Sequence, residues 1–282
     1  MKFVKNLVFA GLAAVALLAC TADPEPKAVI YTIGDSTVKN GQGRGDGGLW
    51  GWGAPFAYFF DSTQVEVVNV ARGGTSSRTY RTLGLWQPTL DSLKAGDFVF
   101  IQFGHNDAGA LNDSTRARGT IRGTGDESEL IDNILTGEQE TVYSYGAYLR
   151  MYVQEIRDKG ATPVLIAPIP RNSWNEEGKI PYNDASYGGW AREVAEQEGV
   201  MFINLNHKLA DAMNALGPDK VTDVLFFARD HTHPTAEGAV LAASLVVEGI
   251  REHPGNPLNK YLLNEYPAGA LADFIGAAEA VK

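Results

Sequence analysis

The chain has 282 residues, of which 44% are hydrophobic and 21% charged, and this balance excludes a disordered, collagen-like or coiled-coil protein. Lys and Arg number 24 against 34 Asp and Glu, so the formal net charge is −10. That charge excludes the basic footprint of a nucleic-acid-binding protein. The single cysteine excludes an intrachain disulfide and argues against a cysteine-based zinc site.

The first twenty residues have the pattern of a targeting signal. Lys2 and Lys5 precede an apolar stretch over 7–18, which is too short to span a bilayer of about 30 Å and fits a signal-peptide core. The stretch leads to Cys20 and resembles a bacterial lipoprotein box, in which the peptide is cut before the cysteine and the thiol carries lipid. We therefore expect a signal peptide over 1–19, a linker with lipidated Cys20 over 20–27, and a lipid-anchored protein of the bacterial cell envelope, periplasmic or at the cell surface. An ordinary secreted protein is the alternative.

Short apolar runs rich in Val, Ile and Phe predict five strands buried on both faces, over 29–33, 65–70, 98–103, 164–169 and 200–205. Amphipathic stretches that predict helices alternate with them, over 55–60, 86–93, 145–159, 185–198 and 235–251. This alternation predicts an α/β fold with a five-stranded open parallel sheet. The expected domain covers 28–253, and a C-terminal extension over 254–282 contains an Ala-rich helix over 268–281. The stretch 105–141 is predicted as a long polar connection, a class of loop that is usually functional or mobile.

Polar residues follow the predicted strands, at the sheet edge where ligands bind in such folds. Ser36 comes after the first strand, and Asp230 and His233 stand just before the last helix. A serine hydroxyl is a weak nucleophile until a base removes its proton. A histidine can be that base near neutral pH when a carboxylate fixes its tautomer. The residue types therefore favour acyl transfer, which further requires N–H donors for an oxyanion.

Four sequence blocks resemble those of the SGNH or GDSL hydrolases, and they are 34–38, 69–74, 104–107 and 230–234. Thr37 after the serine, the run 51–53 and the run 78–80 make the chain similar to the rhamnogalacturonan acetylesterase branch of that family. The resemblance extends over about residues 30–247. It implies a three-layer flavodoxin-like domain and a serine esterase, with neither metal nor cofactor, that removes acetyl groups from a pectic polysaccharide.

The resemblance also assigns roles to individual residues. Ser36 would be the nucleophile, and Asp230 and His233 would complete the triad. The oxyanion would be bound by the backbone N–H groups of Ser36 and Gly74 and by the Asn106 side chain. His231 competes with His233 and Gly73 competes with Gly74, although the spacing favours His233 and Gly74. The insertion between Ala108 and Thr141 departs from the family pattern and could reshape the substrate cleft.

The substrate leaves a weaker signal in the sequence. Trp174, after the fourth predicted strand, is expected to line the cleft, and Arg78 and Arg171 are expected to meet galacturonate carboxylates. The resemblance favours acetylated rhamnogalacturonan, while xylan or another glycan, a lipid or lysophospholipid ester, and a glycan-binding role on a retired hydrolase fold remain alternatives. Asp230, His231 and His233 could ligate a metal, but no further clustered ligand is evident in the sequence.

Overall fold

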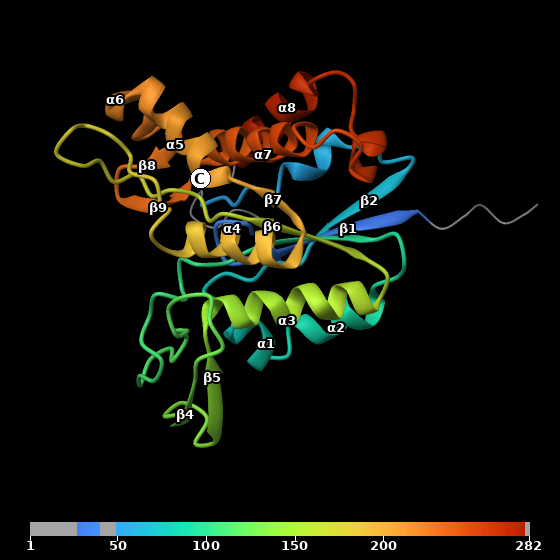
Figure 1. Cartoon of the computed structure of the whole chain (residues 1–282). Helices are drawn as coiled ribbons and strands as arrows, with labels where there is room; N and C mark the ends of the chain where they lie inside the picture. Colours follow the sequence, from blue (N-terminus) through green and yellow to red (C-terminus); the bar gives the residue numbers. More distant parts are fainter. Residues whose placement is uncertain (1–26, 40–48, 280–282) are drawn as a thin grey trace, which may run out of the picture.

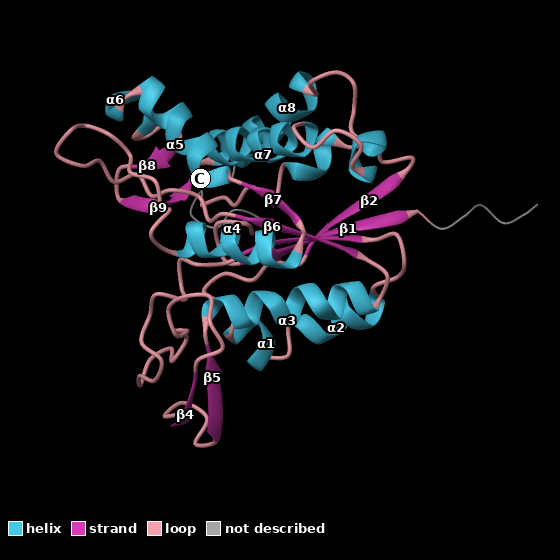
Figure 2. Ribbon diagram, viewed as in Figure 1, coloured by secondary structure: helices cyan, strands magenta, loops and turns pink. Residues whose placement is uncertain are grey.

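A computed structural model describes residues 27–39 and 49–279, so the expected signal peptide and Cys20 lie outside the described residues. The five strands of the central sheet run in parallel, which confirms the predicted fold class (Figure 2). They are ordered β2-β1-β3-β6-β7. Their bounds are β1 (Ala28–Gly34), β2 (Val65–Asn69), β3 (Phe98–Gln102), β6 (Thr162–Ile166) and β7 (Met201–Ile203).

Helices cover both faces of this sheet (Figure 1). One face carries α1 (Thr79–Thr82), α2 (Trp86–Ser92), α3 (Tyr145–Asp158) and α4 (Tyr187–Glu198), and the other carries α5 (Leu205–Leu216), α7 (Ala236–Arg251) and α8 (Ala268–Glu279). Successive residues of β3 enter opposite cores. Phe98 and Phe100 pack with α5 and α7, whereas Val99 and Ile101 pack with α3 and α4. Burial on both faces is the reason that β3 is mostly apolar, whereas the edge strand β2 carries the exposed Glu66.

Several elements differ from the sequence prediction. The expected helix over 55–60 is a 3₁₀ turn, Phe56–Phe59. Helix α5 was missed because it begins directly after β7, where the Asn204 side chain accepts a hydrogen bond from the N–H of His207. The short helix α6 (Pro218–Val221), the 3₁₀ turn Pro257–Tyr261 and the two-residue strand β8 (Phe226–Phe227) were also not predicted.

The insertion after β3 contains an antiparallel hairpin, β4 (Ser128–Asp132) and β5 (Gln139–Tyr143), which stands out from the domain near the start of α3 (Figure 1). Only Ile131 and Val142 of these two strands are buried. A hairpin with so few buried side chains leaves almost no apolar pattern in the sequence, so its strands could not be predicted from periodicity.

The segment after α7 packs against the body of the domain. Leu258, Leu262 and Leu271 belong to the same buried cluster as the inner face of α7, and α8 matches the Ala-rich helix expected over 268–281. No helix in the described part of the chain combines the length and hydropathy needed to cross a bilayer.

Because the strands of the sheet are parallel, the loops after β1, β2 and β3 meet at one edge, where the carboxyl ends of these strands lie.

Candidate active site

A chain of buried, hydrogen-bonded side chains fixes the turn after β1 that contains Ser36. Asp35 Oδ1 accepts hydrogen bonds from the backbone N–H and the hydroxyl of Thr37, at 2.8 and 2.7 Å. Gln102, the last residue of β3, donates to the Thr37 hydroxyl at 2.7 Å and accepts from the Trp52 indole N–H at 2.8 Å. All four side chains are fully buried. The turn therefore holds Ser36 in place without using the serine's own side chain.

The structure brings Ser36, His233 and Asp230 into one hydrogen-bonded line. Ser36 Oγ lies 2.7 Å from His233 Nε2, and His233 Nδ1 lies 2.7 Å from Asp230 Oδ2. Asp230 and His233 lie on β9 (Asp230–Pro234), and the next residue, Thr235, caps α7 by accepting from the Gly238 N–H. Nε2 of His233 can therefore accept the serine proton, and Asp230, hydrogen-bonded to Nδ1, stabilises the positive charge that the ring then carries.

Asp230 is held as a carboxylate. Burial acts to raise its pKa, but the hydrogen bond from the His233 ring and those from the backbone N–H groups of Thr232 and His233 outweigh it, so the pKa of Asp230 lies below its ordinary value. Its Oδ1 accepts from these two N–H groups at 2.8 and 3.1 Å. The D-x-x-H spacing thus forms a turn in which one carboxylate oxygen binds backbone and the other binds the ring.

His231 does not occupy the position of the base. Its Nδ1 pairs with the Thr232 hydroxyl at 3.0 Å, and its backbone carbonyl accepts from the Asn172 N–H. The structure therefore places His233 against Ser36 and directs His231 elsewhere. Among residues 27–39 and 49–279, no three His, Cys, Asp or Glu side chains are grouped in a way that could hold a metal ion.

Gly74 and Asn106 lie beside Ser36 on the wall of the same cavity. The backbone N–H groups of Ser36 and Gly74 donate to no described residue. The Asn106 amide donates one hydrogen bond, at 2.7 Å, to the carbonyl of Thr75, and an amide has two N–H donors. Gly74 has a φ of 81°, a left-handed conformation that favours glycine. Donors without a described partner thus lie on three residues that line the cavity of Ser36.

The acidic residues beside Ser36 and Asn106 hold the loops in place. Asp107 is fully buried and accepts from the backbone N–H of Ser77 at 3.1 Å and from its hydroxyl. Burial raises the pKa of Asp107 to about 7, although the Ser77 hydrogen bonds act in the opposite direction. Burial also lowers the pKa of His105, so this histidine is held in its neutral form.

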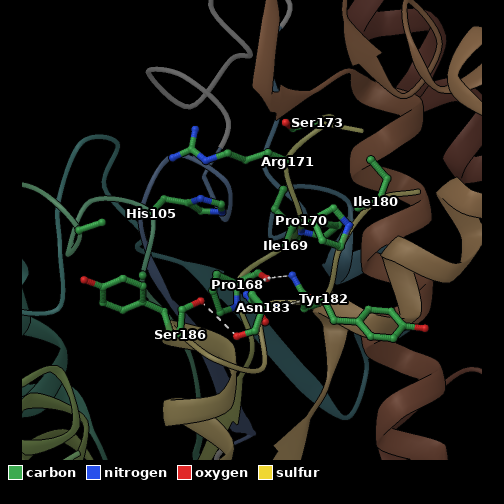
Figure 3. A pocket seen from close by; sticks show the side chains of 15 residues that line it. His105, Pro168, Ile169, Pro170, Arg171, Ser173, Ile180, Tyr182, Asn183 and Ser186 are labelled. Carbon is green, nitrogen blue, oxygen red and sulfur yellow. Dashed lines mark hydrogen bonds between the residues drawn. The ribbon is translucent and has the colours of Figure 1, made fainter. Parts of the chain in front are cut away.

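Ser36 and His233 open into a cavity of about 790 Å³ whose wall includes Arg171 and several residues of the insertion. A second cavity, of about 340 Å³, shares His105 and Arg171 with the first and continues past Pro168 to Tyr182 (Figure 3). The two cavities therefore lie side by side at the carboxyl edge of the sheet. A cavity of this size beside Ser36 suits a substrate larger than a single small ester.

Two of the expected substrate residues lie elsewhere. The Arg78 side chain is fully buried, and its Nε and Nη2 bind the Glu140 carboxylate at 2.6 and 2.5 Å, so the prediction that it meets substrate is wrong. Trp174 packs in part against the core and donates to the Asn172 side chain at 2.8 Å, and it is not among the described residues that line either cavity. Arg171, in contrast, lines both cavities and donates to the Thr232 hydroxyl.

Comparison with known proteins identifies the family. The model of the GDSL-like lipase/acylhydrolase family matches residues 32–241. The chain belongs to this family. It is 34% identical over 221 residues to a rhamnogalacturonan acetylesterase of Emericella nidulans, covering 78% of this chain and 84% of the relative. It is 32% identical to a probable rhamnogalacturonan acetylesterase of Bacillus subtilis, covering 84% of this chain and 98% of the relative.

Two solved structures share the fold of this chain. The Bacillus subtilis protein YxiM superimposes with a TM-score of 0.65 at 24% identity, and the match covers 81% of this chain but only 57% of YxiM. An acetylxylan esterase from Geobacillus stearothermophilus superimposes with a TM-score of 0.54 at 20% identity, covering 79% of this chain and 94% of that one.

Proposed function

We propose that the protein is a serine esterase that removes O-acetyl groups from a plant cell-wall polysaccharide, and that the substrate is acetylated rhamnogalacturonan. The observation that carries the proposal is the line of hydrogen bonds from Ser36 through His233 to Asp230, at 2.7 Å for each contact. The names of the two curated relatives reported above support the pectic substrate. The cavity of about 790 Å³ beside Ser36, with a second cavity next to it, supports a polymer over a small free ester.

The geometry suits a two-step acyl transfer. The Ser36 hydroxyl gives its proton to His233 Nε2 as Oγ forms a bond to the acetyl carbonyl carbon. The N–H groups of Ser36 and Gly74 and the Asn106 amide then face the oxyanion of the tetrahedral intermediate. When the intermediate collapses, the bond to the sugar oxygen breaks and His233 returns the proton to that oxygen. Water activated by the same histidine then releases acetate and restores Ser36.

The test is acetate release from acetylated rhamnogalacturonan and acetylated xylan by the purified protein and its variants. We expect Ser36→Ala and His233→Ala each to lower kcat by at least about 10⁴-fold, because the residues of a triad act as a unit. The matched control is His231→Ala, the neighbouring histidine that does not contact Ser36, and it should retain activity. Equal loss in the control, or full activity of Ser36→Ala, would refute the mechanism.

The substrate is decided by the same assay. Ser36-dependent release from the pectic polymer alone would support the full proposal. Release from xylan alone would keep the mechanism and reject the pectic substrate. Activity confined to long-chain or lysophospholipid esters would reject a carbohydrate substrate, and no hydrolysis of any ester would leave a glycan-binding protein.

We further propose that the protein is held at the bacterial cell envelope by lipid on Cys20. The support is the short apolar segment over 7–18 that leads directly to the single cysteine of the chain. Growth of the producing cells with labelled palmitate should label the protein, and Cys20→Ala should abolish the label. A soluble, unlabelled wild-type protein would instead indicate ordinary secretion.

A further inference from the structure

Four arginines surround the cavity that contains Ser36, and no aspartate or glutamate lies among the described residues that line it. They are Arg72, Arg116, Arg118 and Arg171. None of them forms an ion pair with a described residue. This concentration of positive charge occurs in a chain with a formal net charge of −10. An acetyl ester is neutral, so the charges are suited to another part of the substrate.

We propose that the insertion after β3 provides a carboxylate-binding subsite, formed by Arg116 and Arg118 beside the nucleophile, for the uronate groups of an anionic polysaccharide. The inference rests on the proposed esterase function and identifies which feature of the polymer is recognised next to the ester. A guanidinium presents its N–H donors in a planar fork that matches a carboxylate. Arg72 and Arg171 extend the same positive surface along the cavity wall.

The loop that carries the two arginines is fixed by its own hydrogen bonds. The Asp113 carboxylate accepts from the backbone N–H groups of Thr115, Arg116 and Ala117, at 2.7, 2.8 and 3.0 Å. Ala117, between the two arginines, is buried and has a φ of 41°, a left-handed conformation that is strained for a non-glycine residue. Strain of this kind is retained where it positions functional groups.

Arg118 connects this loop to Gly74, which lines the same cavity as the catalytic serine. Its Nη1 donates to the carbonyl of Gly74 at 3.0 Å. Burial lowers the pKa of Arg118, and the neighbouring charge of Arg116 lowers it further. Two guanidinium groups that repel each other in a partly buried cavity are both stabilised when an anion binds between them.

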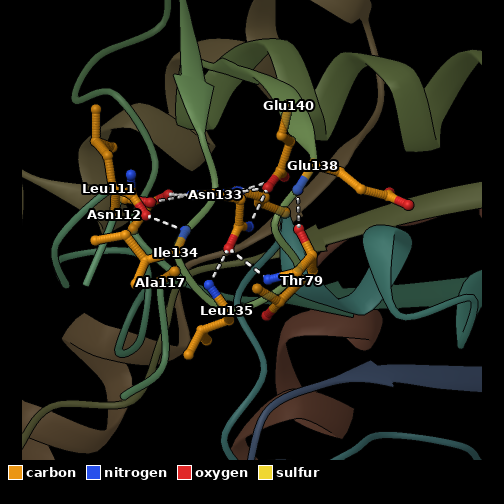
Figure 4. A network of polar contacts seen from close by, with 12 residues as sticks. Thr79, Leu111, Asn112, Ala117, Asn133, Ile134, Leu135, Glu138 and Glu140 are labelled. Carbon is orange, nitrogen blue, oxygen red and sulfur yellow. Dashed lines mark hydrogen bonds and ion pairs between the residues drawn. The ribbon is translucent and has the colours of Figure 1, made fainter. Parts of the chain in front are cut away.

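The insertion is anchored to the domain through the buried Arg78. In addition to its two contacts with Glu140 of β5, Arg78 donates to the carbonyls of Leu111 and Gly119, at 2.7 and 2.9 Å. Asn133 in the turn of the hairpin donates to Glu140 at 2.7 Å and accepts from the N–H of Leu135 at 2.9 Å (Figure 4). These contacts position the loop before substrate arrives, which reduces the entropy lost on binding.

The other lining groups favour a sugar polymer over a phospholipid headgroup. Leu83 and Leu135 are the only leucines among the described residues that line the same cavity, and two leucines offer too little apolar surface for an acyl chain. The hydroxyls of the four lining threonines are already hydrogen-bonded within the protein, so the charge of the arginines decides between the occupants. The occupant is therefore a polysaccharide with carboxylate groups.

Binding can be measured apart from catalysis in the Ser36→Ala background of the full-length protein. We expect calorimetry to detect oligogalacturonate, with an affinity that falls as salt is raised. Arg116→Gln should weaken this affinity about tenfold, as expected for loss of one hydrogen bond to a charged group. Lys159→Gln removes the same charge from an exposed position at the end of α3 and should leave the affinity unchanged. Xylo-oligosaccharide of equal length should bind without dependence on Arg116.

Kinetics provide a second readout in protein with Ser36 intact. The ratio of kcat/KM for acetylated oligogalacturonate to kcat/KM for a neutral aryl acetate should fall about tenfold in Arg116→Gln, through KM. Equal affinity of Arg116→Gln and its parent for oligogalacturonate, or no binding by the parent, would overturn the subsite. Tighter binding of phosphatidylglycerol vesicles would overturn it in favour of a lipid. Arg116-dependent binding without any esterase activity would overturn the proposed function but not the subsite.

Discussion

The buried Arg78–Glu140 pair gives a sharp test of how the insertion is held. Glu140→Gln preserves the shape of the side chain but removes its charge and turns an NH₂ group toward the guanidinium. Because the amide keeps one oxygen acceptor, Arg78 would lose one of its two hydrogen bonds to this side chain, of 2.5 and 2.6 Å, and would remain a fully buried cation without a carboxylate partner. Each such bond contributes about 1.5–3 kcal/mol, and breaking one side of a buried ion pair costs about 3–5 kcal/mol.

We expect the free energy that holds the insertion in place to fall by about 3 kcal/mol, toward the lower end of that range because the Glu140 side chain is 19% exposed. The assay is hydrogen exchange of the amides that pair β4 with β5, together with urea unfolding of the whole domain. Exchange is needed because a hairpin with two buried residues can open before the sheet unfolds.

The matched control is Asp126→Asn, whose carboxylate pairs with Arg150 but is 95% exposed. An exposed pair contributes between zero and about 1 kcal/mol, so this variant should resemble the wild type. If Glu140→Gln changed hairpin exchange by no more than Asp126→Asn does, the insertion would be held by something other than the buried pair. Glu140→Gln should also reduce the ratio of kcat/KM for the anionic substrate to kcat/KM for a neutral one, because the insertion would no longer be held in place.

Two further predictions concern the residues next to the nucleophile. Because burial raises the pKa of Asp107 to about 7, the contribution of this group to stability is fully present below pH 4 and is lost as the pH rises through 7. Asp107→Asn should remove this dependence and make the protein more stable than wild type at pH 8, which urea unfolding across pH would show. Gly74→Ala would place a side chain at a φ of 81° and should lower kcat at least about tenfold, because the backbone N–H that binds the oxyanion would move. In the control Gly73→Ala, the new Cβ would meet Ser36 Cβ at 3.6 Å, an ordinary contact, so kcat should fall much less. Equal losses of kcat in the two variants would refute the choice of Gly74.

The central sheet was predictable because its inner strands are buried on both faces, which leaves runs such as the one at 98–101 without polar interruption. The polar exception in β3 is Gln102, and sequence reasoning did not single it out. Its position at the end of an apolar run, one strand away from Ser36, was the available signal. The hairpin of β4 and β5 could not be found in the same way because most of its side chains face solvent.

The residues around Ser36 were predictable for a different reason. Parallel strands end at one edge of a sheet, so the loops after β1, β2 and β3 must meet, and the structure brings Ser36, Gly74 and Asn106 to one cavity. Arg78 shows the limit of that reasoning. Its partner Glu140 lies 62 residues away in sequence, and no local pattern reveals that a distant carboxylate compensates a charge. An arginine near a catalytic block can thus serve packing as readily as recognition.

The insertion explains how an acidic protein can recognise an anionic polymer. Net charge is an average over the chain, and a value of −10 does not describe a cavity whose described lining contains four arginines and no carboxylate. A partly enclosed cavity concentrates the field of those arginines at its mouth, while acidic residues elsewhere keep the surface soluble. The insertion therefore contributes Glu140, which pairs with the buried Arg78 of the domain, and the arginines Arg116 and Arg118 of the cavity wall. On this reasoning, specificity within the family would change through the insertion while the Ser36 turn and its hydrogen bonds stay constant.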